Sequence, residues 1–211
     1  MVGRQRSLMA LVHAIDAHDR RSAADLIAAA PELVAARATL RASRQDPEPY
    51  LEGILHYCYG GDTALHIAAA AYEPEIVDVL IGHGAAVDAK NRRGAQPIHY
   101  AADGAPGSHA WNPTAQAATL AGLMAAGADP NATDKSGVTP LHRAVRTRCA
   151  DAVRALLDGG ADPERPNGSG TSPAQLAAVT SGRGGSGSVE AKAQQQLIIE
   201  LLQRYRPAQA R

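Results

Sequence analysis

The sequence predicts an all-α solenoid of stacked repeats, because two phrases recur along it at a common interval. The first phrase starts at residues 63, 96, 139 and 172, at intervals of 33, 43 and 33 residues. Its four copies are Thr63-Ala64-Leu65-His66, Gln96-Pro97-Ile98-His99, Thr139-Pro140-Leu141-His142 and Ser172-Pro173-Ala174-Gln175. The second phrase, a Gly-Ala pair with an Asp shortly after it, starts at Gly84, Gly127 and Gly160. Its intervals are 43 and 33 residues, so one period with a single enlarged copy runs through the chain.

A short helix is expected to begin at each copy of the first phrase. In the third copy the Thr139 hydroxyl can cap the first turn, and Pro140 occupies a position where its missing N–H is not needed. Leu141, Ala144 and Val145 then have the i, i+3, i+4 spacing of one buried stripe. The same pattern in the other copies predicts a short amphipathic helix in each unit.

A second, longer helix is expected before each Gly-Ala phrase. Its apolar stripe in one unit consists of Ile76, Val77, Leu80 and Ile81, and Gly84 provides the left-handed residue that commonly ends a helix. Each unit is therefore a helical hairpin. Two helices cannot enclose their own apolar surface, so neighbouring units must stack into a solenoid.

At these residues the chain resembles the ankyrin repeat family, whose signature contains Thr-Pro-Leu-His and whose unit is a β-turn followed by two antiparallel helices. The resemblance implies about five helix-turn-helix units with short β-turn tips, in one domain over residues 1–211. Gln175 replaces the signature His in the last unit, and atypical terminal units are usual in such arrays. We expect units at 7–37, 58–90, 91–133, 134–166 and 167–205, with insertions at 38–60, 103–113 and 180–188.

The composition agrees with thin, closely stacked helices. Aromatic residues make up 3% of the 211 residues and Phe is absent, so burial must come from Leu, Ile, Val and Ala. The formal net charge of +0 gives no reason to expect nucleic-acid binding, which calls for a strongly basic chain. Arg outnumbers Lys, and Ala and Gly are abundant, which indicates a GC-rich, bacterial genome.

No segment indicates a membrane, a disulfide framework or a metal site. The apolar run from Leu8 to Ile15 is too short for the core of a signal peptide, and no later run is long enough to span a bilayer. Cys58 and Cys149 lie in different units and form no Cys-x-x-Cys pair. We therefore expect a cytoplasmic protein without a cofactor. The oligomeric state is left open.

The first candidate site is the concave face, where the resemblance implies that partner proteins bind. In the family this face is formed by the β-turn tips and by outward positions of the first helices. The corresponding residues here are Tyr59, Asp62, Arg92, Arg93, Lys135, Ser136 and Arg146. The basic members can bind carboxylates, with bidentate contacts from the arginines, so the predicted partner is a protein with an acidic surface.

The second candidate site is the edge that carries insertions 103–113 and 180–188. We expect the two loops to meet across the shorter turn of the unit between them, with Trp111 packed against this edge. The Gly182–Gly187 amides resemble an anion-binding nest, whereas a dinucleotide site lacks its βαβ context. The edge is the alternative site, for a small ligand or an anion, and its residues are Asp103, His109, Trp111, Asn112, Arg148 and Arg183.

No catalytic constellation is indicated. His66, His99 and His142 recur with the repeat, and in the family this His bonds the turn backbone, so we interpret them as structural. His56 and Cys58 have no third ligand at a persuasive spacing for a metal. The sequence therefore favours a non-catalytic protein-binding module.

Overall fold

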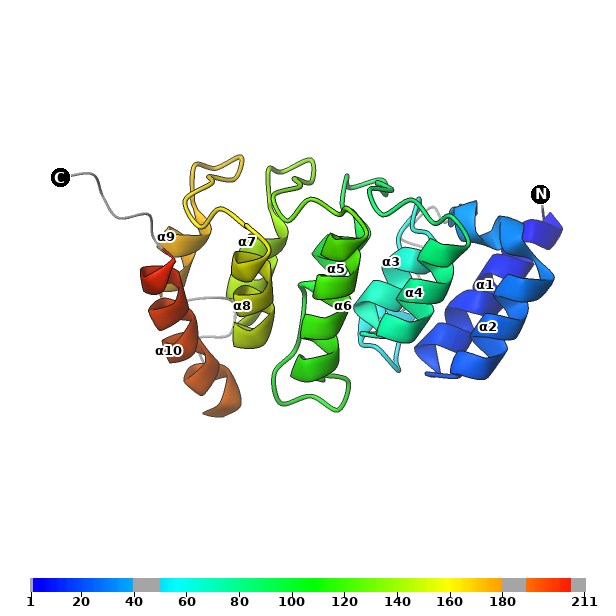
Figure 1. Cartoon of the computed structure of the whole chain (residues 1–211), viewed down its shortest axis with the longest axis horizontal. Coiled ribbons are helices and arrows are strands. Elements are labelled where there is room, and N and C mark those ends of the chain that lie inside the picture. Colours follow the sequence, from blue (N-terminus) through cyan, green and yellow to red (C-terminus); the bar gives the residue numbers. More distant parts are fainter. Residues whose placement is uncertain (1, 40–49, 180–188, 206–211) are drawn as a thin grey trace.

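The structure is a computed structural model and describes residues 2–39, 50–179 and 189–205. Helical pairs follow one another in a row from the N-terminal to the C-terminal end (Figure 1). The helices are α1 (Val2–Asp16), α2 (Arg20–Ala29), α3 (Ala64–Ala70), α4 (Pro74–Gly82), α5 (Pro97–Ala101), α6 (Pro113–Ala125), α7 (Pro140–Thr147), α8 (Ala150–Asp158), α9 (Pro173–Ala178) and α10 (Val189–Arg204). A 3₁₀ turn, η1, spans Pro31–Ala35, and two short strands are β1 (Tyr50–Leu51) and β2 (His56–Tyr57).

The helices form two layers. The first helices of successive pairs contact one another in the order α1, α3, α5, α7 and α9, and the second helices do so in the order α2, α4, α6, α8 and α10. Leu65, Ile98 and Leu141 occupy equivalent positions between neighbouring pairs, and each is 0% exposed. The predicted all-α repeat architecture is confirmed. None of the helices in the described ranges is long and apolar enough to cross a membrane.

Each motif histidine joins its own helix start to the next unit. His66 Nδ1 accepts a hydrogen bond from the Thr63 backbone N–H at 3.1 Å, so its Nε2 carries the proton and donates to the Ala95 carbonyl, also at 3.1 Å. His99 and His142 bond the carbonyls of Val138 and Thr171 in the same way. Burial lowers the pKa of His66 to about 3 and that of His99 to about 4. These neutral side chains tie units together, as the structural interpretation predicted.

The turn tips project along one edge of the row (Figure 1) and share one construction. The side-chain oxygen of Asn91 accepts hydrogen bonds from the backbone amides of Arg93 and Ala95, at 2.9 and 3.0 Å. Asp134 and Asn167 hold the next two tips with equivalent bonds. Backbone bonds also connect neighbouring tips, from Arg92 N to Gly60 O, from Lys135 N to Arg93 O and from Gly168 N to Ser136 O. The tips therefore form a fixed platform for the side chains they carry.

The first insertion, residues 38–60, contains an antiparallel hairpin that the repeat pattern did not predict. Tyr50 pairs with Tyr57, and Leu51 pairs with His56. The Ile54 backbone N–H donates to the Asp16 carboxylate at 3.2 Å, so the hairpin covers the end of α1. Residues 40–49 of this insertion lie outside the described residues.

The second insertion forms the loop between α5 and α6, on the edge opposite the tips (Figure 1). Trp111 packs against the core, and its indole N–H donates to Gln116 Oε1 at 3.3 Å. Gln116 is fully buried, and its amide donates to the carbonyls of Ala101 and Asp103, both at 3.0 Å. One buried side chain therefore satisfies the backbone where the loop leaves α5. The third insertion, residues 180–188, lies outside the described residues.

Candidate functional site

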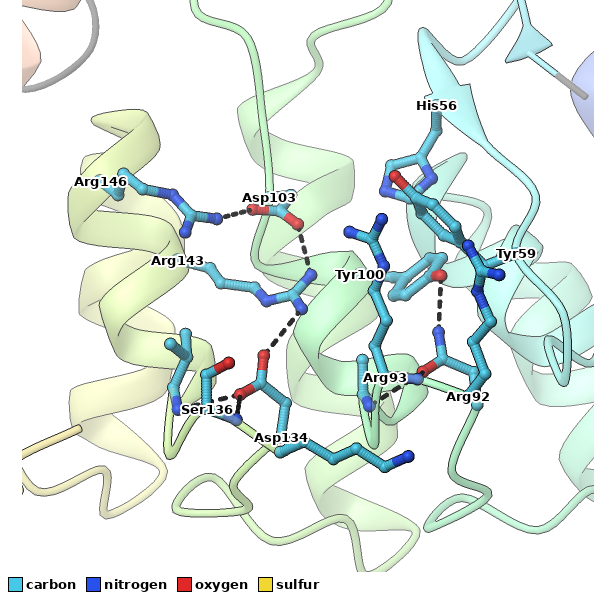
Figure 2. A pocket seen from close by; sticks show the side chains of 14 residues that line it. His56, Tyr59, Arg92, Arg93, Tyr100, Asp103, Asp134, Ser136, Arg143 and Arg146 are labelled. Carbon is cyan, nitrogen blue, oxygen red and sulfur yellow. Dashed lines mark hydrogen bonds and ion pairs between the residues drawn. The ribbon is translucent and has the colours of Figure 1, made fainter. Parts of the chain in front are cut away.

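A pocket of about 620 Å³ lies where the tips of three successive units meet the first helices (Figure 2). We call it the basic pocket. The tips contribute Tyr59, Arg92, Arg93, Lys135 and Ser136, the helices contribute Tyr100, Arg143 and Arg146, and the hairpin and the α5–α6 loop contribute His56 and Asp103.

The floor of the basic pocket is a buried hydrogen-bonded group. The Tyr100 hydroxyl donates to both carboxylate oxygens of Asp62 at 2.9 Å, and the Asn91 amide donates to Asp62 at the same distance. The Tyr59 backbone N–H donates to Asp62 at 2.7 Å. Burial and the adjacent Asp62 carboxylate raise the pKa of Tyr100 well above its usual value, so the phenol keeps its proton. The His56 ring packs against the Tyr100 ring, with centroids 4.5 Å apart and the ring planes tilted by 38°.

Asp62 corrects one prediction. It was expected to contact a partner at the surface, but it is 1% exposed. Side chains of the next unit donate hydrogen bonds to its buried carboxylate. Without these bonds, burying the charge would cost free energy of folding. Asp62 therefore positions Tyr59 and Tyr100 and is not a contact surface.

At the rim of the basic pocket, two arginines lie over the ring of Tyr59. The Arg93 guanidinium carbon lies 4.1 Å from the centroid of the Tyr59 ring, and that of Arg92 lies 5.8 Å from it. Both arginines are exposed and Tyr59 is half-buried. A guanidinium over an aromatic face is attracted by the ring electrons, and this contact leaves the edge N–H groups of Arg93 facing away from the ring.

The opposite wall is an ion-pair network formed by residues of two neighbouring units. Figure 2 shows Arg143 between Asp103 and Asp134, at 2.7 and 3.4 Å, and Arg146 beside Asp103 at 3.3 Å. Burial alone would lower the pKa of Arg143, but the two carboxylates outweigh it and raise the pKa. The buried Arg143 Nε has no hydrogen-bond partner among the described residues.

Sequence reasoning missed Arg143. A signal for it does exist, because Arg143 directly follows a motif histidine, as Ile67 and Tyr100 follow theirs. Tyr100 and Arg143 both line the basic pocket from this position, so a charged residue there was a candidate for the site.

The balance of charge in the basic pocket is positive. Five basic side chains line it, and the lining carboxylates are those of Asp103 and Asp134. The Asp62 carboxylate adds a further negative charge beneath the floor. The basic side chains therefore outnumber the carboxylates even when Asp62 is counted. A pocket of this charge favours an anionic ligand.

The predicted residues of the concave face come together, apart from Asp62. The basic pocket is lined by Tyr59, Arg92, Arg93, Lys135, Ser136 and Arg146. Asp103, which was assigned to the alternative edge, also lines this pocket because it pairs with Arg143 and Arg146.

The other residues of the alternative edge have separate structural settings. Asn112 caps α6 by accepting from the Ala115 backbone N–H at 3.0 Å. Arg148 ends α7 in the left-handed conformation, with a φ of 60°, and is 9% exposed. His109 is exposed in the loop. Arg183 lies outside the described residues, so the predicted meeting of the two loops stays a prediction.

Comparison with known proteins gives one consistent similarity. Residues 33–111 match a family model described as ankyrin repeats (3 copies), and residues 123–177 match one described as ankyrin repeats (many copies). The two matches together cover more than half of the chain. A stretch of 91 residues is 40% identical to E3 ubiquitin-protein ligase KEG of Arabidopsis thaliana. That alignment covers 43% of this chain but 5% of the plant protein, so the chain spans a small part of that relative.

Proposed function

Because the chain belongs to the ankyrin repeat family, we propose that it is a non-catalytic module that binds an acidic segment of another protein in the basic pocket. The observation that carries this proposal is the excess of basic side chains in one cavity. Arg93 is held by Tyr59, and Arg143 by two carboxylates, so part of the ordering entropy is lost before a ligand arrives. The exposed Arg93 guanidinium can bind a carboxylate through paired N–H groups.

Two further observations support a non-catalytic role. Burial raises the pKa of Cys149 to about 11, which disfavours the thiolate that a nucleophile requires. His66, His99 and His142 use both ring nitrogens within the fold, so they are not available for proton transfer. We also propose that the protein resides in a bacterial cytoplasm, which its composition and the buried free cysteines, Cys58 and Cys149, support.

The proposal is tested by affinity capture from the native cell followed by mass spectrometry. Replacing Arg92 and Arg93 by Glu should remove the captured partner without lowering the melting temperature, because both side chains are exposed. The matched control replaces Arg154 and Arg165, which are exposed and lie outside the basic pocket, by Glu. This control changes the net charge equally and should retain the partner. Capture that survives in both variants contradicts the proposal.

A further inference from the structure

A smaller recess of about 90 Å³ adjoins the basic pocket. The two cavities share His56, Tyr100 and Asp103 in their walls, so they are adjacent. The recess lies between the hairpin and the α5–α6 loop, and its lining includes Ile54, Tyr72, Ala105, Ser108 and Trp111. Unlike the basic pocket, it has mainly apolar and aromatic walls.

The recess has a fixed frame. The Tyr72 hydroxyl donates to the Asp103 carbonyl, and the Gln116 amide donates to the same carbonyl. The Trp111 indole is held by Gln116. The Asp103 carboxylate meanwhile pairs with Arg143 and Arg146 in the basic pocket. Backbone and side chain of one residue therefore connect the two cavities.

Each cavity also contains a buried polar atom without a partner in the described part of the chain. These atoms are Ser108 Oγ in the recess and Arg143 Nε in the basic pocket. Buried polar groups in folded proteins are normally hydrogen-bonded, so the Arg143 Nε–H can donate to a ligand oxygen, and the Ser108 hydroxyl can donate to or accept from a polar atom of a ligand.

We propose that the partner segment is a two-part motif, in which acidic residues occupy the basic pocket and one neighbouring apolar or aromatic side chain enters the recess. This inference rests on the proposed function and specifies the partner. A water molecule needs only about 10–15 Å³ of cavity, so the recess has room for one medium-sized side chain. The positive charge of the adjoining basic pocket favours an apolar side chain that has acidic neighbours over one that has none.

The test uses a random peptide library displayed on phage and panned against the full chain. Enriched peptides should place Asp or Glu within a few residues of a Val, Leu, Ile or Phe. Changing that apolar residue to Ala in a synthetic enriched peptide should weaken binding about tenfold or more, as loss of a buried side chain requires. Trp111 is the only Trp of the chain and lines the recess. Its fluorescence should therefore shift with the enriched peptide but not with the Ala-substituted peptide at saturation.

A variant of the protein tests the same contact from the other side. Ala105 is exposed and lines the recess. Ala105→Leu should therefore fill the recess and weaken binding of the enriched peptide by a similar factor. Ala126→Leu, at an exposed position at the end of α6 outside both cavities, is the matched control and should bind normally. Melting temperatures of both variants separate a folding defect from a filled recess.

The possible failures are distinguishable. Binders that lose affinity with the Arg92/Arg93 reversal but show no apolar preference and no Trp111 response overturn the two-part motif and leave the proposed function standing. If the affinity of every enriched peptide is unchanged by replacing Arg92 and Arg93 with Glu, or if the library yields no peptide that needs these arginines, the proposed function is overturned as well.

Discussion

The guanidinium of Arg93 lies over the ring of Tyr59, 4.1 Å from its centroid, at the rim of the basic pocket. Tyr59 is in turn positioned by its backbone bond to the buried Asp62. The orientation of an exposed cation therefore depends on a carboxylate that is only 1% exposed.

This relationship predicts that Tyr59→Ala weakens binding of an acidic peptide by a few-fold. A cation–π contact at an exposed site contributes about 0.5–1 kcal/mol, and its loss also frees the Arg93 side chain. Isothermal titration with an enriched acidic peptide measures the effect. Tyr59→Phe keeps the aromatic face and should bind like the unmodified chain; equal weakening in both variants would mean that the hydroxyl, and not the ring, matters.

A second prediction compares two glycines at the same turn position. Gly137 has a φ of 71°, and a Cβ there would lie 2.6 Å from the Gly168 backbone nitrogen of the next tip. Gly170 has a φ of 82°, but nothing lies within 4 Å of its Cβ position. Both Ala variants carry left-handed strain, whereas only Gly137→Ala should also force adjacent tips apart.

Urea unfolding should therefore show a larger loss of stability for Gly137→Ala than for Gly170→Ala. The difference measures the contact between tips. Equal losses would show that backbone strain alone sets the cost and that the tips can separate freely.

The stacking of units predicts a third result. Leu141 is 0% exposed between neighbouring units, so Leu141→Ala should lower the free energy of unfolding by about 2–5 kcal/mol through the cavity it leaves. Chemical denaturation followed by circular dichroism gives this value. Leu197→Ala, on a side chain that is 42% exposed, is the control and should cost much less. An unchanged midpoint for Leu141→Ala would show that the assigned register is wrong.

The fourth prediction concerns pH. The usual pKa of His is 6.5, and in the fold it is lowered to about 3 in His66 and to about 4 in His99. The unfolded chain therefore takes up protons below about 6.5 that the folded chain does not, so stability is complete above that pH and falls as the pH drops toward 4 and then 3. Urea midpoints across this range measure the loss, which should be on the order of a few kcal/mol.

His99→Gln tests the origin of this pH dependence. Gln175 already performs the equivalent cap in the last unit, where it accepts from the Ser172 backbone N–H at 2.9 Å. The variant should keep the helix start and flatten the decline of stability with falling pH. A decline as steep as in the unmodified chain would mean that groups other than His99 govern it.

Most of the fold could be predicted because its determinants are local. A helix start is defined within four residues by Thr139, Pro140 and His142. In the structure, Thr139 and His142 form a capping box at this helix start. Leu141 was assigned to a buried stripe from its spacing alone and is buried.

The details of the site depended on contacts distant in sequence. Asp62 was expected at the surface, but its partners Asn91 and Tyr100 come 29 and 38 residues later. Arg143 was missed because its pairing with Asp103 spans 40 residues. The period identifies which positions are equivalent, but it does not show which side chains pair across units.

The shared construction of the tips has a consequence for how such a site can evolve. Asn91 and Asp134 fold their tips through bonds to backbone amides, and these bonds do not depend on the side chains of Arg92, Arg93, Lys135 and Ser136. These four positions can change charge or size while the turns keep their shape. Divergent descendants could thus acquire different partners by substitutions that leave thermal stability nearly constant.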